Sequence, residues 1–208
     1  MHALVFLWQP TESPVHELPV HDLVVAADSG LETAEKWGVT PDVAIGDFDS
    51  TSMLVHAERS GVMTHQVPSE KDETDAELAI AAALERGATE ITLIASGAGR
   101  VDHALAILLG LGVEQLAQCN VQAWIDDTLV FAVRHSVDLD VTNGRRVSLI
   151  PLYGNVSGVT THNLKYSLSD ATLKVGSAFA VSNEFEPEAH KASVTVGAGT
   201  LLVMQSQL

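Results

Sequence analysis

The first half of the chain alternates short apolar runs with segments of helical periodicity. Most of the runs are apolar at successive positions, which is typical of strands buried on both faces of a sheet; they cover residues 3–7, 23–27, 43–45, 62–67 and 91–95. The segments between them predict helices over residues 31–37, 52–59, 75–86 and 102–111. This alternation indicates an α/β layer with a mostly parallel sheet and flanking helices.

Helical periodicity disappears after about residue 120. Apolar stretches follow at residues 121–125, 129–133, 147–152, 178–181 and 201–204, and Asn143-Gly144 is a strong signal for a hairpin turn. We therefore predict two domains, an α/β domain over residues 1–125 and a smaller all-β sandwich over residues 126–208, with the crossover between the two patterns inside residues 118–142.

Composition and charge restrict the ligands. Lys and Arg total 11 and Asp and Glu total 27, so the formal net charge is −16. Such a surface repels nucleic-acid phosphates and anionic lipids, and we expect neither nucleic acid nor a membrane as partner. A polyanionic substrate would need a cation to mediate its contact with this protein.

The remaining composition is that of a packed protein from a reducing compartment. Hydrophobic residues make up 46% of the chain. The longest apolar run, residues 104–113, is too short to cross a bilayer, and the first ten residues carry no signal-peptide pattern. The single cysteine, Cys119, cannot form an intrachain disulfide. We therefore expect a cytoplasmic protein.

Acidic residues follow the predicted strands at their carboxyl ends, where ligands bind in open α/β sheets. Asp28 follows the second strand, and Asp47 and Asp49 follow the third. In extended backbone a spacing of two places both carboxylates on one side, where they repel unless a proton or a cation lies between them. Oxygen ligands of this kind suit Mg²⁺, which usually binds substrate phosphates as well. The alternative is a solvated turn with helix-capping aspartates.

The segment Lys71-Asp72-Glu73-Thr74-Asp75 leads into the helix predicted from residue 75. Thr74 and Glu77 have the spacing of a capping box, and Asp75 complements the helix dipole. Capping explains these residues fully, yet a helix N-terminus beside a metal carboxylate also cradles phosphate, and Lys71 adds a mobile positive charge.

Small residues and one arginine follow the fifth predicted strand, over residues 96–103. The sequence S-G-A-G-R-V-D-H permits close approach of a ligand to the backbone, but its glycine spacing is not that of the dinucleotide fingerprint. Arg100 either binds phosphate in a bidentate manner or forms a structural ion pair with Asp102. His103 taken alone is more typical of a packing or capping residue than of a catalyst.

Taken in order, these motifs resemble the thiamine pyrophosphokinase family. The first half contributes A-D-S-G, P-D-V-A-I-G-D-F-D-S, K-D-E-T-D-A-E-L-A and G-R-V-D-H-A-L. In the second half, N-L-K-Y-S-L at 163–168 resembles the family's G-L-x-Y-x-L, and V-S-N-E-F at 181–185 resembles its S-N-E-F. The similarity runs from about residue 26 to residue 204, and the pairing of G-D-F-D-S with K-D-x-T-D is highly specific.

The resemblance implies an enzyme with an α/β domain for ATP and Mg²⁺ and a β-sandwich that helps to bind thiamine, in a homodimer with active sites at the subunit interface. An intact diphosphate passes from ATP to the hydroxyethyl group of thiamine, giving thiamine diphosphate and AMP. The implied magnesium ligands are Asp47, Asp49 and Asp75, and the implied proton acceptor is either Asp72 or Asp102. The implied ATP contacts are Asp28, Ser29, Lys71, Thr74, Arg100 and His103. The implied thiamine contacts are Tyr166, Ser182 and Asn183.

The sequence departs from the family pattern at four places: Ser29 and Asn163 replace glycines, residues 95–99 replace G-A-x-G-G, and Ile107 replaces a common asparagine. These departures bear on the nucleotide and thiamine contacts and on the choice of acceptor alcohol.

Two other functions stay open at this point. Residues 43–51 also fit the D-x-D-x-T pattern of haloacid-dehalogenase-like phosphatases, with Asp47 as nucleophile, Asp49 as acid and base, and Asp126-Asp127 as late metal carboxylates. That class leaves the K-D-E-T-D segment unexplained. The other alternative is a non-catalytic protein of the same fold that binds a small ligand or a divalent cation.

Overall fold

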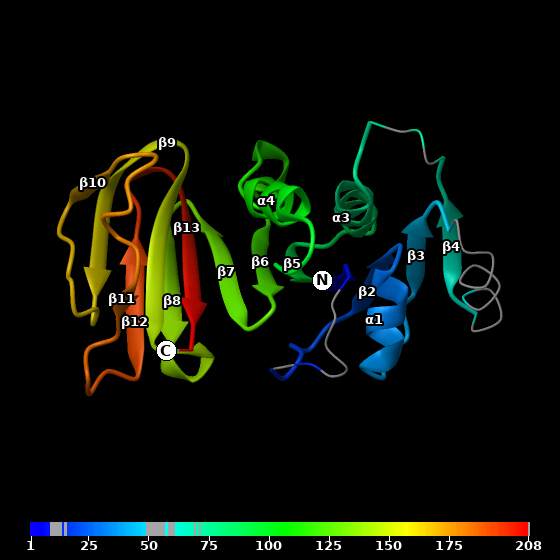
Figure 1. Cartoon of the computed structure of the whole chain (residues 1–208), viewed down its shortest axis with the longest axis horizontal. Helices are drawn as coiled ribbons and strands as arrows, with labels where there is room; N and C mark the ends of the chain where they lie inside the picture. Colours follow the sequence, from blue (N-terminus) through cyan, green and yellow to red (C-terminus); the bar gives the residue numbers. More distant parts are fainter. Residues whose placement is uncertain are drawn as a thin grey trace. The chain divides into compact units, whose positions relative to one another are not determined.

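The computed structural model describes residues 1–8, 14, 16–48, 57, 61–68, 70 and 72–207 of the 208-residue chain. The predicted site residues Asp49 and Lys71 lie outside the described residues, as does the predicted helix over 52–59 except for Ala57. The chain forms two compact units (Figure 1), Met1–Gly110 with Ala117–Asp126 and Leu111–Leu116 with Asp127–Leu208.

The first unit is built on a sheet whose described strands are all parallel, in the order β4-β3-β2-β1-β5-β6. The strands are β1 (His2–Phe6), β2 (Leu23–Ala27), β3 (Val43–Gly46), β4 (Met63–Gln66), β5 (Glu90–Ala95) and β6 (Asn120–Ile125). Strands β2 and β3 are buried at every residue, as their uninterrupted apolar runs predict.

Helices α1 (Gly30–Lys36), α3 (Asp75–Glu85) and α4 (Val101–Gly110) agree with the predicted helices to within one residue at each end. Helix α3 packs on β1, β2 and β3, and α1 packs on β1 and β2. Gly30 is required at the start of α1, because a Cβ there would lie 2.0 Å from the carbonyl oxygen of Phe6. None of the described helices is long and apolar enough to span a membrane.

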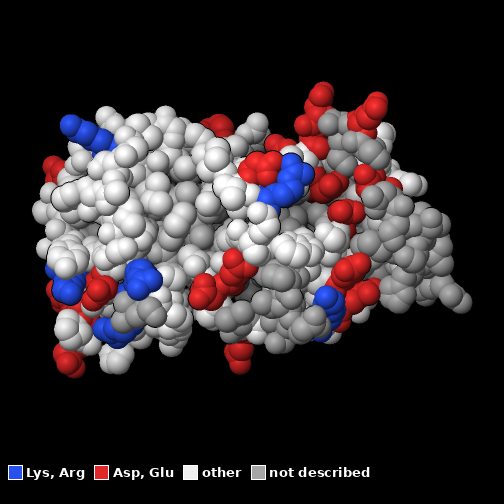
Figure 2. All heavy atoms as spheres, in the orientation of Figure 1, with Lys and Arg blue, Asp and Glu red and all other residues white. Residues whose placement is uncertain are grey.

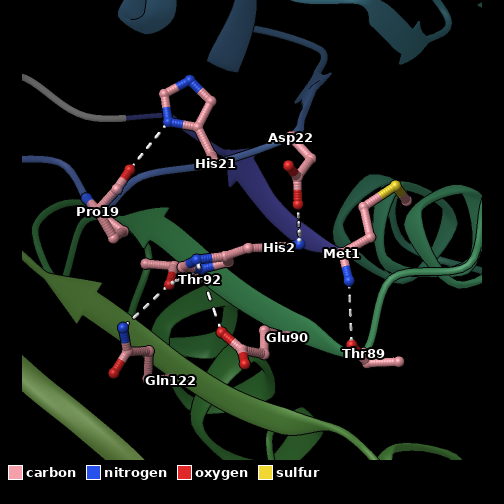
Figure 3. A network of polar contacts seen from close by, with 9 residues as sticks. All are labelled: Met1, His2, Pro19, His21, Asp22, Thr89, Glu90, Thr92 and Gln122. Atoms are coloured by element: carbon pink, nitrogen blue, oxygen red, sulfur yellow. Dashed lines mark hydrogen bonds and ion pairs between the residues drawn. The ribbon is translucent and has the colours of Figure 1, made fainter.

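A polar network closes the edge of this sheet where its strands begin (Figure 3). The hydroxyl of Thr92, which is fully buried, accepts a hydrogen bond from Gln122 Nε2 at 3.0 Å and lies 2.9 Å from His2 Nε2. The backbone N–H of His2 donates to Asp22 Oδ2 at 2.9 Å. These groups satisfy one another's hydrogen-bonding needs, so we assign this amino edge of the sheet a structural role.

The second unit is a β structure whose described pairings are all antiparallel, in the order β7-β13-β9-β12-β8, with β10 and β11 on β9. The strands are β7 (Thr128–Val133), β8 (Ser136–Asp140), β9 (Arg146–His162), β10 (Ala171–Leu173), β11 (Asn183–Glu184), β12 (Lys191–Thr195) and β13 (Ala198–Ser206), with short 3-10 turns at Glu114–Leu116 and Val141–Asn143. Its core is aliphatic and includes Leu139, Val147, Leu149, Leu164 and Leu201.

Three fold predictions need correction. Strand pairing over the whole chain is mixed, parallel in the first unit and antiparallel in the second, so a mostly parallel sheet is too simple a description. Residues 178–181 form a turn, closed by the N–H of Val181 donating to Ala178, instead of a strand. Asn143-Gly144 does not close a hairpin, because β12 lies between β8 and β9. Gly144 is needed there because a Cβ would lie 2.2 Å from the backbone of Ser206.

Candidate active site

Two predicted acidic residues of the first unit, Asp28 and Asp47, lie at the carboxyl ends of neighbouring strands. Asp28 follows β2 with a positive φ of 46°, and its N–H donates to the carbonyl of Ile45 in β3 at 2.7 Å. A Cβ on Gly46 would lie 3.3 Å from Asp28 Oδ1. Glycine at position 46 therefore lets the Asp28 carboxyl group lie against the backbone that leads directly into Asp47.

The turn after β3 is anchored on both sides of Asp47. The Asp47 carbonyl accepts a hydrogen bond from Gln66 Nε2 at the end of β4, at 3.2 Å. Phe48 has a φ of 47° and is only 4% exposed, so its ring fixes the turn in the core. The side chain of Asp47 itself is half-buried at this edge. Asp49, the next predicted ligand, is outside the described residues.

The capping box at the start of α3 is confirmed. Thr74 Oγ1 accepts from the N–H of Glu77 at 3.2 Å and donates to Glu77 Oε2 at 2.8 Å, while the Thr74 N–H donates to the same oxygen. The Thr74 hydroxyl, which we predicted as a phosphate contact, is therefore engaged in the cap. Asp75 follows in the first helical turn and is half-buried, and Asp72 is exposed.

The donor chemistry of this edge suits a hard cation. Among the described residues, no three His, Cys, Asp or Glu side chains gather closely enough to hold a metal ion. The predicted set contains Asp49, which is not described, together with Asp47 and Asp75. All three are carboxylates, the ligand type that Mg²⁺ takes, and Asp28 adds a fourth carboxylate against Gly46.

The glycine-rich loop after β5 is held by a residue whose role the sequence did not reveal. Asp126 follows β6 with a φ of 53°, and its carboxylate accepts from Ser96 Oγ at 2.7 Å and from the Gly97 N–H at 2.9 Å. Ser96 Oγ in turn accepts from the N–H of Ala98 at 3.0 Å. The one feature of the sequence that could have indicated this role is that Asp126 directly follows the apolar run at residues 121–125, which forms the strand next to β5. The loop is thus rigidly fixed at its first half.

Arg100 and Asp102 form the ion pair that the sequence allowed. Arg100 donates to both carboxylate oxygens of Asp102, at 2.6 and 3.2 Å, and both side chains are exposed. The hydrogen bonds from Arg100 lower the pKa of Asp102 to about 2. His103 is exposed, and its backbone N–H donates to Asp102 at 3.0 Å. Arg100 directly follows Gly99 at the end of the glycine-rich loop. Ser29 stands at the start of α1 without a side-chain capping bond.

In the second unit, Asn183 orients Tyr166. Asn183 is 4% exposed. Its Oδ1 accepts hydrogen bonds from the N–H of Tyr166 at 3.0 Å and from the N–H of Glu184 at 2.9 Å. Its Nδ2 donates to the Tyr166 carbonyl at 2.9 Å. The Tyr166 side chain is 60% exposed, and Lys165 Nζ lies 5.4 Å from its ring centroid. The Asn183 amide is thus engaged with backbone through Oδ1 and one N–H, and its contact with thiamine stays a prediction. Ser182 is exposed with a φ of 61°.

Comparison with known proteins decides the family. One family model, described as the catalytic domain of thiamin pyrophosphokinase, matches residues 16–122, and another, its vitamin B1 binding domain, matches residues 134–201. The chain belongs to the thiamin pyrophosphokinase family. It is 30% identical over 174 residues to a thiamine pyrophosphokinase of Bacillus subtilis, an alignment that covers 79% of this chain and 78% of that protein.

Solved structures of the family have the same fold. A thiamin pyrophosphokinase family protein from Enterococcus faecalis is 26% identical, with a TM-score of 0.83 over 100% of this chain and 99% of that one. A thiamin pyrophosphokinase from Geobacillus thermodenitrificans is 25% identical, with a TM-score of 0.77 over 100% of this chain and 97% of that one. The phosphatase alternative is set aside on this family membership. The Asp126 carboxylate that it required as a metal ligand is engaged with Ser96 and Gly97.

The choice of proton acceptor leads to a test by pH dependence. A carboxyl group with a lowered pKa stays ionised until the pH falls toward 2, so the Arg100–Asp102 pair persists at neutral pH and breaks only as the pH falls through that value. So weak a base is unsuited to accept a proton near pH 7. We expect Asp102→Asn to raise the KM for ATP while leaving in place the acidic limb of the pH profile of kcat/KM, measured down to about pH 3. If instead Asp102→Asn lost the acidic limb of this profile and Asp72→Asn kept it, Asp102 would be the base.

Proposed function

We propose that this protein transfers an intact diphosphate from ATP to the hydroxyethyl group of thiamine, with Mg²⁺, and releases AMP. The hydroxyl oxygen of thiamine forms a bond to the β-phosphorus, the bond from that phosphorus to the oxygen that bridges to the α-phosphate breaks, and the hydroxyl proton passes to a carboxylate. The observation that carries the proposal is the match of both family domains, catalytic and vitamin B1 binding, along one chain.

The carboxylates of the first unit would hold the metal. Asp47 and Asp75, with Asp49, are the proposed ligands, and Asp28 lies against Gly46, the residue before Asp47. Mg²⁺, when bound, neutralises the phosphates and the departing AMP, which a chain of net charge −16 needs. Figure 2 shows how acidic side chains predominate over the first unit, with few basic ones between them.

The proposed phosphate contacts come from the loops at the same edge of the sheet. Arg100, which pairs with Asp102 at the exposed surface, is the first proposed cation, and Lys71 is the second. Ser29 and His103 complete the proposed nucleotide contacts. We assign proton acceptance to Asp72, which is exposed beside the N-terminus of α3, because Arg100 makes Asp102 too weak a base.

The second unit is proposed to bind thiamine in a β-sandwich arrangement. The exposed ring of Tyr166, fixed through its backbone by Asn183, offers a flat surface to the thiamine rings, and Ser182 lies next to Asn183 in the chain. Thiamine is a cation, so the acidic surface attracts it.

A homodimer with the active sites at the subunit interface is also proposed. Helix α4 supports it, since Val101, Leu105 and Leu109 are 76%, 52% and 40% exposed in the single chain. The single cysteine agrees with a cytoplasmic location.

The test of the proposed function is a product analysis. The purified chain is mixed with ATP, MgCl₂ and thiamine, and the products are identified by mass. Thiamine diphosphate and AMP in equal amounts are expected, with none when thiamine is omitted. Thiamine monophosphate with ADP would contradict diphosphate transfer, and tight binding of ATP and thiamine without any product would favour the non-catalytic alternative.

A further inference from the structure

Trp8 lies just beyond the carboxyl end of strand β1 in the first unit. The residues before it in β1, Ala3 to Phe6, are fully buried, and Leu7 still belongs to the sheet edge because its N–H donates to the Ile94 carbonyl of β5 at 2.8 Å. Trp8 is therefore the first residue beyond the carboxyl end of β1. Its side chain is 45% exposed, so a large aromatic ring lies at the edge where ligands bind in sheets of this type.

The strand order places Trp8 at the edge position where sheets of this type bind ligands. The chain builds β2, β3 and β4 outward on one side of β1, then returns to build β5 and β6 on the other side. The strand order therefore changes direction between β1 and β5, which is the switch point at which doubly wound sheets bind nucleotides. Trp8 follows β1 at this edge, and the glycine-rich loop over residues 96–100 follows β5.

The indole ring lies next to that loop. Gly99 has a φ of 84°, and a Cβ added to it would lie 3.9 Å from Trp8 Cζ3. Asp126 fixes the loop through Ser96 and Gly97, so the ring has a rigid neighbour. Arg100 follows Gly99 directly. An aromatic ring thus lies next to Gly99, and an arginine is the next residue of the same loop; a ligand with a planar ring and phosphates needs both kinds of group.

The other two tryptophans pack on rings of their own unit. Trp37 lies edge-on to Phe6, with centroids 5.7 Å apart, and Trp124 is stacked on His16 at 3.8 Å and is 8% exposed. Trp8 is the most exposed of the three, so more of its ring surface is accessible to a ligand.

We propose that Trp8 stacks on the purine ring of ATP and so determines the preference of this enzyme for a nucleoside triphosphate over a bare polyphosphate. This inference rests on the proposed function for the identity of the nucleotide. The ring of Trp8 contacts the base, and Arg100 holds the phosphates on the other side of Gly99.

The test compares Trp8→Ala with Trp8→Phe. Stacking of a base on an aromatic ring is lost in the alanine variant, which should raise the KM for ATP about tenfold, while the phenylalanine variant stays within about threefold of the wild type. The KM for thiamine should not change. Inorganic tripolyphosphate, which has no base, should inhibit the wild type and Trp8→Ala with the same inhibition constant.

A direct binding measurement separates this inference from the proposed function. ATP with Mg²⁺ should quench the tryptophan fluorescence of the wild type and leave Trp8→Phe, which keeps Trp37 and Trp124, largely unquenched. That result stands even if no thiamine diphosphate is formed, in which case only the proposed function fails. Equal ATP affinity in the wild type and Trp8→Ala overturns the stacking role. An equal loss of ATP and tripolyphosphate binding overturns it too, since Trp8 would then merely support the loop.

Discussion

Asp47→Asn is expected to lower kcat by at least about 100-fold while the protein stays folded. Asp47 lies half-buried at the end of β3. It stands in the chain between Gly46, against which the Asp28 carboxyl group lies, and the buried Phe48. Asparagine keeps the shape of the side chain but removes the negative charge that a magnesium ligand supplies. Because the metal neutralises charge that develops during the transfer, the loss falls on kcat.

The matched control for this variant is Asp42→Asn. Asp42 precedes the same strand, at its amino end, and its Oδ2 accepts a hydrogen bond from the Val24 N–H at 2.8 Å. The amide oxygen of asparagine can accept the same bond, so this variant removes one negative charge and leaves the site edge intact. We expect its kcat to stay within about twofold of the wild type.

Steady-state kinetics at saturating Mg²⁺, with circular dichroism to confirm folding, measure the difference between the two variants. Asp75→Asn, at the start of α3, should repeat the loss seen for Asp47→Asn. Turnover near the wild-type rate in both Asp47→Asn and Asp75→Asn would show that these carboxylates do not hold the metal.

Asn183→Ala has the second large expected effect, on stability and on thiamine binding together. The buried amide of Asn183 satisfies three backbone groups, the N–H and the carbonyl of Tyr166 and the N–H of Glu184. Its removal leaves these groups without their partners and should lower the free energy of unfolding by about 3 kcal/mol. Tyr166 then loses its fixed position, and the KM for thiamine should rise roughly tenfold.

Chemical denaturation and thiamine kinetics test both effects, with two comparison variants. Asn155→Ala removes an exposed asparagine whose Oδ1 accepts one bond, from the Val175 N–H at 3.1 Å, and should cost less than about 1 kcal/mol. Tyr166→Ala should raise the thiamine KM without the loss of stability, and the double variant should be no worse for thiamine than either single variant. A destabilised Asn183→Ala with an unchanged thiamine KM would show that Asn183 does not position Tyr166 for thiamine, and an unchanged KM in Tyr166→Ala would remove Tyr166 from the thiamine site.

Local spacing explains where sequence and structure agree. The Thr74–Glu77 capping box, and strands β2 and β3 with their uninterrupted apolar runs, are determined by neighbours within four residues, and the structure reproduces them. Asp28 lies against Gly46, the residue before Asp47, as expected for residues that follow neighbouring parallel strands. Local pattern failed at residues 178–181 and at Asn143-Gly144, because a short apolar run or a turn dipeptide does not specify which strand lies next to it.

The sequence by itself determined the kinds of elements in the first unit, the acidic edge of its sheet and, through the order of its motifs, the family. Only the tertiary structure decided which polar groups hold one another: Asp126 with Ser96, 30 residues apart, and Asn183 with Tyr166, 17 residues apart. It also decided that Trp8 lies beside Gly99. The physical reason is that such partners are brought together by strand order and register, which arise from the packing of the whole sheet and not from the spacing of residues along the chain.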